Sequence, residues 1–229
     1  MSQLGDFLLV LPVLVMSIVA HEYAHGYAAL HQGDSTAKAL GRLTMNPLKH
    51  IDPWMSLILP AMLWFGSGGE FLFGGAKPVP VDPRNYRQYP RSDIIVSLAG
   101  IATNLVLVVV FWVLAAGVGV VGVGAGAGRG AFVVLQGMMY WGIWFNLLLA
   151  NFNLIPIPPL DGSHVLYHLL PEEIGLRYRQ LSRYGILIII AIIFFFPRAL
   201  FLLLLPAIST LRLAMAAISP FALTPFGLF

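Results

Sequence analysis

The stretch LGDFLLVLPVLVMSIVAHEYAHGYAAL covers residues Leu4–Leu30 and decides the class of fold. It is longer than the ~20 mostly apolar residues that a helix needs to cross the hydrocarbon core of a bilayer. Asp6 is the only charged residue before His21, so the basic n-region of a secretory signal is missing, and no small-residue cleavage site ends the stretch. We therefore expect a membrane helix that is retained in the mature chain.

The composition of the whole chain agrees with a lipid environment. Hydrophobic residues make up 59% of the sequence and charged residues only 10%, whereas soluble domains carry about a quarter charged residues. In lipid the backbone must satisfy its own hydrogen bonds, and the apolar runs are too long for barrel strands, so we expect helices. The net charge of +3 is scattered and gives no nucleic-acid footprint, and the absence of cysteine excludes disulfides and thiolate metal sites.

The middle of the chain predicts two further long helices and one short apolar segment. The long helices span about Asp93–Val121 and Ala131–Leu154. The run Gly117–Gly130 is rich in glycine and is predicted to be a flexible loop. The segment Ile51–Phe65 would reach only ~22 Å as a helix, which is marginal for a crossing and favours a re-entrant element.

Proline and glycine interrupt the remaining segments. Phe71–Pro90 is predicted to be extended or looped. A small β-hairpin within the 70–90 loop is also compatible with this sequence. Residues Leu160–Arg183 look like interfacial helical turns, and Tyr184–Leu205 is an apolar block interrupted at Pro197. The tail after Pro206 is expected to form a further partial span or an interfacial hairpin.

These patterns predict an all-α polytopic membrane protein with about four to six membrane helices, including the short re-entrant segment. We expect one integral-membrane domain over residues 1–229, without an appended or inserted soluble domain. Its parts are a first helix at about 4–30, a re-entrant or hairpin region at about 51–90, core helices at about 93–121 and 131–154, a segment at 153–162 and C-terminal helices at about 184–229.

Basic residues predict the orientation, because cytoplasmic loops are enriched in lysine and arginine. Three clusters would then face the cytoplasm: Lys38, Arg42 and Lys49; Lys77, Arg84, Arg87 and Arg91; and Arg177, Arg179 and Arg183. This topology is self-consistent if the short segment does not cross, or if it crosses and returns through Phe71–Ala76, and a re-entrant element is the simpler explanation. It puts the end of the first helix in the cytoplasm and His21 and His25 ~10 Å below that surface.

The first helix carries the most informative motif, His21-Glu22-Tyr23-Ala24-His25, which has the pattern HExxH. Residues four apart lie on one face of a helix, so both imidazoles can reach one zinc ion. Glu22 lies beside them and can take a proton from water. The alternative is a pair of polar residues that bind neighbouring helices, but ionisable groups inside a membrane helix are costly and usually mark function.

A catalytic zinc ion usually keeps three protein ligands, so a third must come from elsewhere. Asp161 is the first candidate, because it follows a helix end that is broken by prolines and can lie at a similar depth. An ordinary turn or helix N-cap also explains Asp161-Gly162, and on local grounds this explanation is slightly favoured. His164 is the rival third ligand, and His50 is more simply a hydrogen-bonding loop residue.

Together these stretches resemble the site-2 protease family of intramembrane zinc metalloproteases. The resemblance covers about Ala20–Arg183 and rests on order, spacing and five stretches: HEYAH, GRLTMNPLKHIDP (Gly41–Pro53), GGAKPVPVDPRNYR (Gly74–Arg87), AGIATN (Ala99–Asn104) and NLIPIPPLDG (Asn153–Gly162). HExxH alone occurs in many soluble peptidases, whereas HExxH combined with the last stretch in a polytopic chain is very specific. This sequence departs from the family's common A-G-P form at Ile101, which stands where the proline usually is.

The resemblance implies a set of roles. His21, His25 and Asp161 would bind Zn²⁺, Glu22 would act as general base and acid, and Asn153 would help to hold the substrate backbone. Gly74–Pro80 resembles a substrate-side hairpin whose edge could hold an unwound substrate by strand addition, although a plain connector explains it equally well. Asn104 lies in an apolar helix and should have a hydrogen-bond partner on another helix or in the site.

The resulting expectation is a multi-pass protein of a prokaryotic cell membrane that cleaves single-span membrane proteins within or near the bilayer, from a site toward the cytoplasm. The alternative is a zinc-binding membrane protein without catalysis, either a metal transporter or a scaffold. A transporter would need polar ligands repeated across several helices, and a scaffold would not need Glu22.

Overall fold

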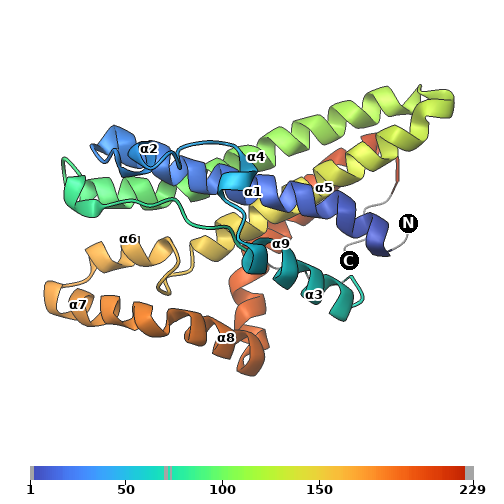
Figure 1. Ribbon diagram of the computed structural model, residues 1–229. Helices are drawn as coiled ribbons and strands as arrows, with labels where there is room; N and C mark the ends of the chain where they lie inside the picture. The colour runs from blue at the N-terminus through green and yellow to red at the C-terminus, as the bar shows by residue number, and fades with distance from the viewer. Residues whose placement is uncertain (1–2, 70–71, 73, 225–229) are drawn as a thin grey trace.

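The computed structural model describes residues 3–69, 72 and 74–224, and within these residues every regular element is helical (Figure 1). The long helices are α1 (Gln3–Gln32), α4 (Arg91–Val123), α5 (Arg129–Asn153) and α9 (Pro197–Ile218). In the described part of the chain, four segments at these helices are long and apolar enough to cross a membrane. The prediction of an all-α polytopic membrane protein is therefore confirmed.

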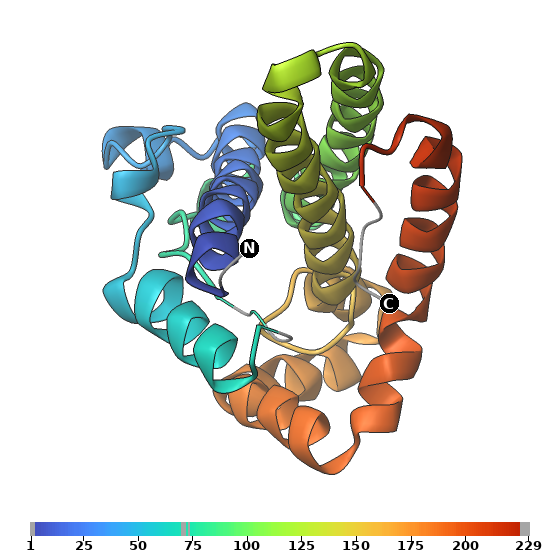
Figure 2. The same cartoon turned by 90° about the vertical axis from the view of Figure 1, so that its right-hand side faces the viewer.

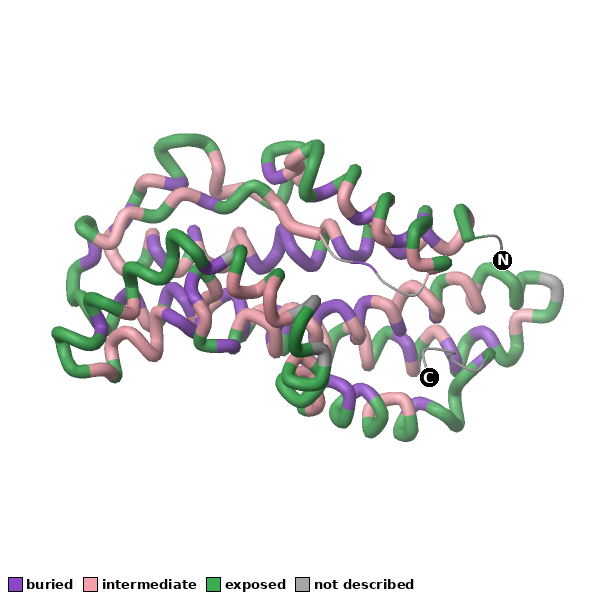
Figure 3. Tube along the Cα trace, turned by 90° about the horizontal axis from the view of Figure 1, so that it is seen from below, coloured by how far each residue is buried: buried purple, intermediate pink, exposed green. Residues whose placement is uncertain are grey.

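The bundle is built on α1, α4 and α5, which pack against one another. Figure 1 shows α4 and α5 as an antiparallel hairpin, with α1 alongside. Figure 3 shows buried residues on the inward faces and exposed residues outside. Large apolar side chains on the outer face of α4, such as Val106, Val109 and Val113, are more than half exposed, as expected for a lipid-facing surface.

The glycine-rich run is helical over Gly117–Val123 and again from Arg129, so the predicted flexible loop over Gly117–Gly130 was wrong there, whereas the helix predicted to end near Val121 extends two residues further. The turn between α4 and α5 is confined to the residues around η4 (Gly126–Gly128). Gly119 is buried, and a Cβ there would overlap the carbonyl group of Phe221. Glycine serves close packing here rather than flexibility, because it lets the C-terminal segment lie directly on α4.

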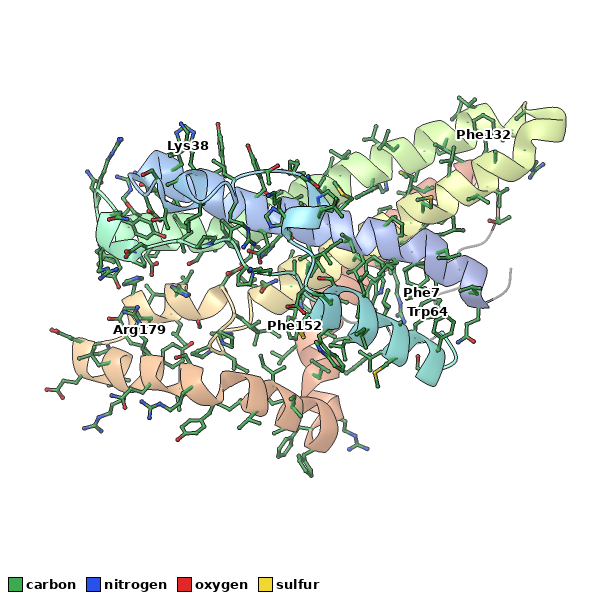
Figure 4. All side chains as sticks on the ribbon, viewed as in Figure 1. Phe7, Lys38, Trp64, Phe132, Phe152 and Arg179 are labelled. Atoms are coloured by element: carbon green, nitrogen blue, oxygen red, sulfur yellow. The ribbon has the colours of Figure 1, made fainter. Side chains whose placement is uncertain are left out.

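The short apolar segment lies against the N-terminal half of α1. A six-residue π-helix, η2 (Pro53–Ile58), continues into the eight residues of α3 (Leu59–Gly66). Phe7 and Trp64 lie next to each other where α1 meets α3, with ring centroids 6.3 Å apart (Figure 4). The chain then returns to Gly75, whose amide donates to the Met55 carbonyl over 2.9 Å. This course agrees with the predicted re-entrant segment.

The 70–90 loop contains no strand in its described residues. Gly74–Val81 is extended and is followed by η3 (Pro83–Asn85), a single 3₁₀ turn. Residues 70, 71 and 73, where one arm of the hairpin left open by the sequence would lie, are outside the described residues. The remaining short elements are α2 (Thr36–Ala39), η1 (Pro47–Lys49) and η6 (Ser219–Phe221).

The C-terminal third wraps around the bundle. After α5 come α6 (Gly162–Leu169), α7 (Glu172–Gln180), η5 (Leu181–Tyr184) and α8 (Gly185–Phe195). The predicted interfacial helical turns over Leu160–Arg183 are thus present as α6, α7 and η5. Figure 2 shows α9 standing along one side of the molecule.

The described part of the tail belongs to a span rather than to an interfacial hairpin, but this span starts before Pro206, because α9 runs through Pro206 without a break and forms a candidate span over Arg198–Phe221. Ala207, Leu211 and Ile218 are buried in a cluster with Tyr140 and Ile143 of α5. This packing keeps the helix continuous at a residue that cannot donate a backbone hydrogen bond. The chain breaks instead at Phe196, where Pro197 starts the new helix.

Candidate metal centre

His21 and His25 lie on the face of α1 that packs against α4. Their Nε2 atoms are 3.0 Å apart, and the imidazole rings meet edge to face. His21 is 5% exposed, so the pair is inside the bundle. The i, i+4 spacing thus brings both rings to one point, as the sequence predicted.

Asp161 reaches the same point from the segment between α5 and α6. Its Oδ2 atom lies 3.1 Å from His21 Nε2 and 3.3 Å from His25 Nε2. Asp161 occupies the N-cap position of α6, yet its side chain makes no capping hydrogen bond. The N-cap explanation that the sequence left open is therefore not what the structure shows, since the carboxylate turns toward the histidines.

The hydrogen bonds of the two rings set their tautomers. His21 Nδ1 lies 2.5 Å from Asn104 Oδ1, and His25 Nδ1 lies 2.8 Å from the Val96 carbonyl oxygen. Both oxygens only accept, so each Nδ1 carries a proton, and a neutral ring in this tautomer directs an Nε2 lone pair toward Asp161. Asp161 Oδ2 is itself buried without a hydrogen-bond partner.

When both rings are neutral, three electron-pair donors converge on one point, and a metal cation would stabilise this arrangement. Separations of 3.0, 3.1 and 3.3 Å match the ~3.3 Å expected between ligands of a tetrahedral zinc ion with bonds of ~2.0–2.1 Å. Among the described residues, these three form the one group of histidine and carboxylate side chains whose ligand atoms all lie within 4.8 Å. The residues fit a zinc ion.

Helix α4 provides the wall behind the two histidines. A Cβ built on Gly100 would lie 2.6 Å from His21 Cε1 and 2.6 Å from His25 Nε2, so only glycine allows α1 and α4 to approach this closely. Ile101, the departure from the family pattern, is buried next to it, and α4 is helical from Arg91 onward despite the missing proline.

A buried chain of amides continues from His21 into the bundle. Asn104 Nδ2 donates to Asn146 Oδ1 over 2.7 Å, and Asn146 Nδ2 donates to Ser17 Oγ over 2.9 Å. Both asparagines are fully buried. The expectation that Asn104 has a polar partner is confirmed. Asn146 was missed by the sequence analysis, and its one signal was an amide in the apolar middle of the stretch Trp141–Ala150.

Glu22 points to the extended segment rather than to the histidine pair. Its Oε2 atom accepts a hydrogen bond of 2.7 Å from the Val79 amide. The segment is itself anchored, since the Lys77 amide donates to the His50 carbonyl and Arg42 Nη2 donates to the Lys77 carbonyl. The segment Gly74–Pro80 therefore holds Glu22 at the edge of the site.

Three other residues considered from the sequence lie outside this group. Asn153 donates to the Leu149 carbonyl of its own helix over 3.0 Å. His50 is buried, with Nε2 2.8 Å from the Thr44 carbonyl oxygen. His164, the rival third ligand, has its Nδ1 atom 3.1 Å from Asp93 Oδ2 and belongs to a different cluster.

Comparison with known proteins places the chain in a family. Residues 113–196 match Peptidase family M50. The chain is 34% identical over 182 residues to "Putative zinc metalloprotease YwhC" of Bacillus subtilis, which covers 78% of this chain and 77% of that protein. It is 32% identical over 193 residues to "Putative zinc metalloprotease Rip2" of Mycolicibacterium smegmatis, covering 84% of this chain and 69% of that protein. No solved structure matches. This membrane protein therefore belongs to Peptidase family M50, the site-2 protease family of metalloproteases.

Proposed function

We propose that the chain is an intramembrane zinc endopeptidase that hydrolyses peptide bonds of single-span membrane proteins. In this proposal His21, His25 and Asp161 bind Zn²⁺, and Glu22 is the general base and acid. The observation that carries it is the convergence of two Nε2 lone pairs and an unpartnered carboxylate oxygen within helices long and apolar enough to span a membrane. The names of the relatives YwhC and Rip2 support zinc as the metal.

The depth of the site supports a substrate within the bilayer. His21 lies eleven residues before the end of α1, or ~16 Å along a helix that rises 1.5 Å per residue. The end of α1, the start of α4 and the turn between α6 and α7 lie together at one end of the molecule (Figure 1). We propose that this end faces the cytoplasm of a prokaryotic cell, from which water reaches the site.

The protein's own groups divide the work of hydrolysis. A bound zinc ion supplies Lewis acidity, which polarises a carbonyl group and makes water acidic near neutral pH. Glu22 accepts a proton from water at its carboxylate and then delivers it to the leaving amine. The Val79 amide orients that carboxylate, while Asn104 and the Val96 carbonyl keep the imidazole Nε2 atoms unprotonated. We further propose that Asn153 contacts the substrate backbone.

The experiment that tests this function is Glu22→Gln in the purified protein, reconstituted in liposomes. The change keeps the size of the side chain and removes its basicity, so we expect native zinc stoichiometry and a loss of cleavage of about 10²–10⁴-fold. Substrates come from comparing membrane proteomes of cells with the native and the Glu22→Gln protein, in which single-span proteins should accumulate. Equal cleavage by both proteins would overturn Glu22 as the general base, whereas no cleavage by either protein would favour a zinc-binding protein without hydrolysis.

A further inference from the structure

A second cluster of acid and histidine side chains lies between α4 and α6. Asp93 Oδ2 is 2.8 Å from His168 Nε2 and 3.1 Å from His164 Nδ1. Asp93 is 5% exposed, and the side chain of His168 is 6% exposed. A carboxylate this deeply buried requires partners, so the cluster fixes the two helices to each other.

We propose that Asp93 is a positioning residue of the metal centre, which holds α6 through His164 and His168 and thereby places Asp161. This inference rests on the proposed zinc site. Asp161 immediately precedes α6, and His164 follows it by three residues, less than one helical turn. Any shift of α6 away from α4 would therefore move the Asp161 carboxylate away from the imidazoles.

Little local structure holds Asp161 in place without this contact. Helix α6 has only eight residues, too few for a helix that is stable by itself in water. The preceding segment from Leu154 is irregular, and Asp161 makes no capping bond. Other anchors of this segment include Gly162, which packs against the Leu154 carbonyl, and Tyr178, whose hydroxyl group donates to the Pro156 carbonyl over 3.0 Å.

Helix α4 makes all of its contacts with the site from one face. Asp93, Val96, Gly100 and Asn104 follow one another at intervals of three, four and four residues, which is the spacing of a single helical face. The last three contact His21 and His25 of α1, whereas Asp93 contacts the helix that follows Asp161. These four residues of α4 thus hold the proposed ligands from α1 and from the start of α6 in fixed positions relative to one another.

The cluster borders a cavity of about 220 Å³, which Ser163, Tyr167, Tyr178, Arg179 and Ser182 also line. Figure 4 shows Arg179 of α7 on the side toward α6, and its guanidinium carbon lies 5.3 Å from the Tyr167 ring centroid. The rings of Tyr89 and Tyr167 pack against His168 at 5.1 and 4.8 Å. Aromatic packing and the Asp93 carboxylate thus fix His168 from several sides.

The test measures the rate at which purified protein loses zinc to excess chelator. Changes in the surroundings of metal ligands typically weaken metal affinity by about 10–100-fold, so Asp93→Ala should release zinc at least ~10-fold faster than the native protein, with unchanged helix content by circular dichroism. Asp34→Asn is the matched control. Asp34 is an equally buried carboxylate that binds Thr36, Asn85 and the Asp82 amide, so its loss should leave zinc release unchanged.

A double-mutant cycle with Asp161→Asn, which keeps an oxygen ligand and should weaken zinc binding without abolishing it, shows whether Asp93 acts through Asp161. If it does, Asp93→Ala speeds zinc release less in the Asp161→Asn protein than in the native protein. Additive losses, or native zinc release in a folded Asp93→Ala protein, would overturn the proposal. If Asp93→Ala fails to fold, His168→Gln replaces it in the same cycle, with the same expected result. Failure of the proposed function is a separate outcome, because it would appear as an absence of stoichiometric zinc in the native protein.

Discussion

Two clusters in this molecule have the same composition, an acid and two histidines four residues apart on a helix, yet their geometry differs. In the first, His21 and His25 use Nδ1 for oxygen acceptors, and their Nε2 atoms meet Asp161 with all three ligand atoms within 4.8 Å. In the second, His164 and His168 direct ring nitrogens at Asp93 itself. Within the described residues only the first converges as a metal group does.

The difference shows that the partners of a histidine decide its role. In the first cluster Asn104 and the Val96 carbonyl accept hydrogen bonds from the Nδ1–H groups, which leaves the Nε2 lone pairs for a cation. In the second cluster the Asp93 carboxylate accepts hydrogen bonds from the N–H groups of both histidines, and the result is a structural contact. A spacing of four residues allows either outcome, so the motif alone does not separate a metal ligand from an ion pair.

Removing one histidine from each cluster should give the largest contrast. His25→Ala removes a proposed ligand, and we expect it to abolish stoichiometric zinc binding, measured by elemental analysis of the purified protein. His168→Ala removes one of two contacts to Asp93, so the protein should keep its zinc but release it about 10-fold faster to a chelator. Equal zinc content and equal release rates in the two variants would contradict the division of roles.

Filling the space between α4 and the first cluster should have the next largest effect. Gly100→Ala places a methyl group 2.6 Å from both imidazoles, so we expect weaker zinc binding and a loss of about 1–3 kcal/mol of stability from overpacking. Gly117→Ala is the matched control on the same helix, since nothing lies within 4 Å of its Cβ position. It should stabilise α4 or leave it unchanged. Thermal unfolding in detergent and zinc titration measure both effects, and similar behaviour of the two variants would argue against the close packing at Gly100.

The smallest effect is expected at a third buried carboxylate, Asp34, which lies in neither of the two clusters. Burial alone would raise the pKa of Asp34, but hydrogen bonds from the Thr36 hydroxyl group, the Asp82 amide and Asn85 hold it below its usual value. The unfolded chain therefore binds a proton more readily, so this stabilisation is present above pH ~4 and is lost as the pH falls below that value.

Asp34→Asn should accordingly make the thermal midpoint less sensitive to acid than that of the native protein, by a few degrees, since ~1 kcal/mol shifts the midpoint by about 2–4 °C at this size. The measurement is made between pH 5 and pH 3 with chelator present, so that zinc loss does not contribute. The same acid sensitivity in both proteins would mean that the Asp34 hydrogen bonds add no stability.

Much of the fold follows from local patterns. The apolar runs predicted α1, α4 and α5 to within a few residues, because helix formation depends on contacts between residues three and four apart. The predictions failed where distant packing overrides a local signal. Gly117–Val123 is helical because the segment at Phe221 packs on it, and α9 passes Pro206 because its apolar face is buried against α5.

The sequence by itself determined that this chain crosses a membrane, that His21 and His25 share a helix face and that Glu22 lies beside them, since each depends only on composition or helical spacing. The tertiary structure alone decided that Asp161, rather than His164, meets that pair and that Asp93 holds His164 and His168. It also revealed Asn146 behind Asn104. The physical reason is that hydrogen-bond partners from distant helices set which nitrogen carries the proton, and no local pattern records which helices will meet.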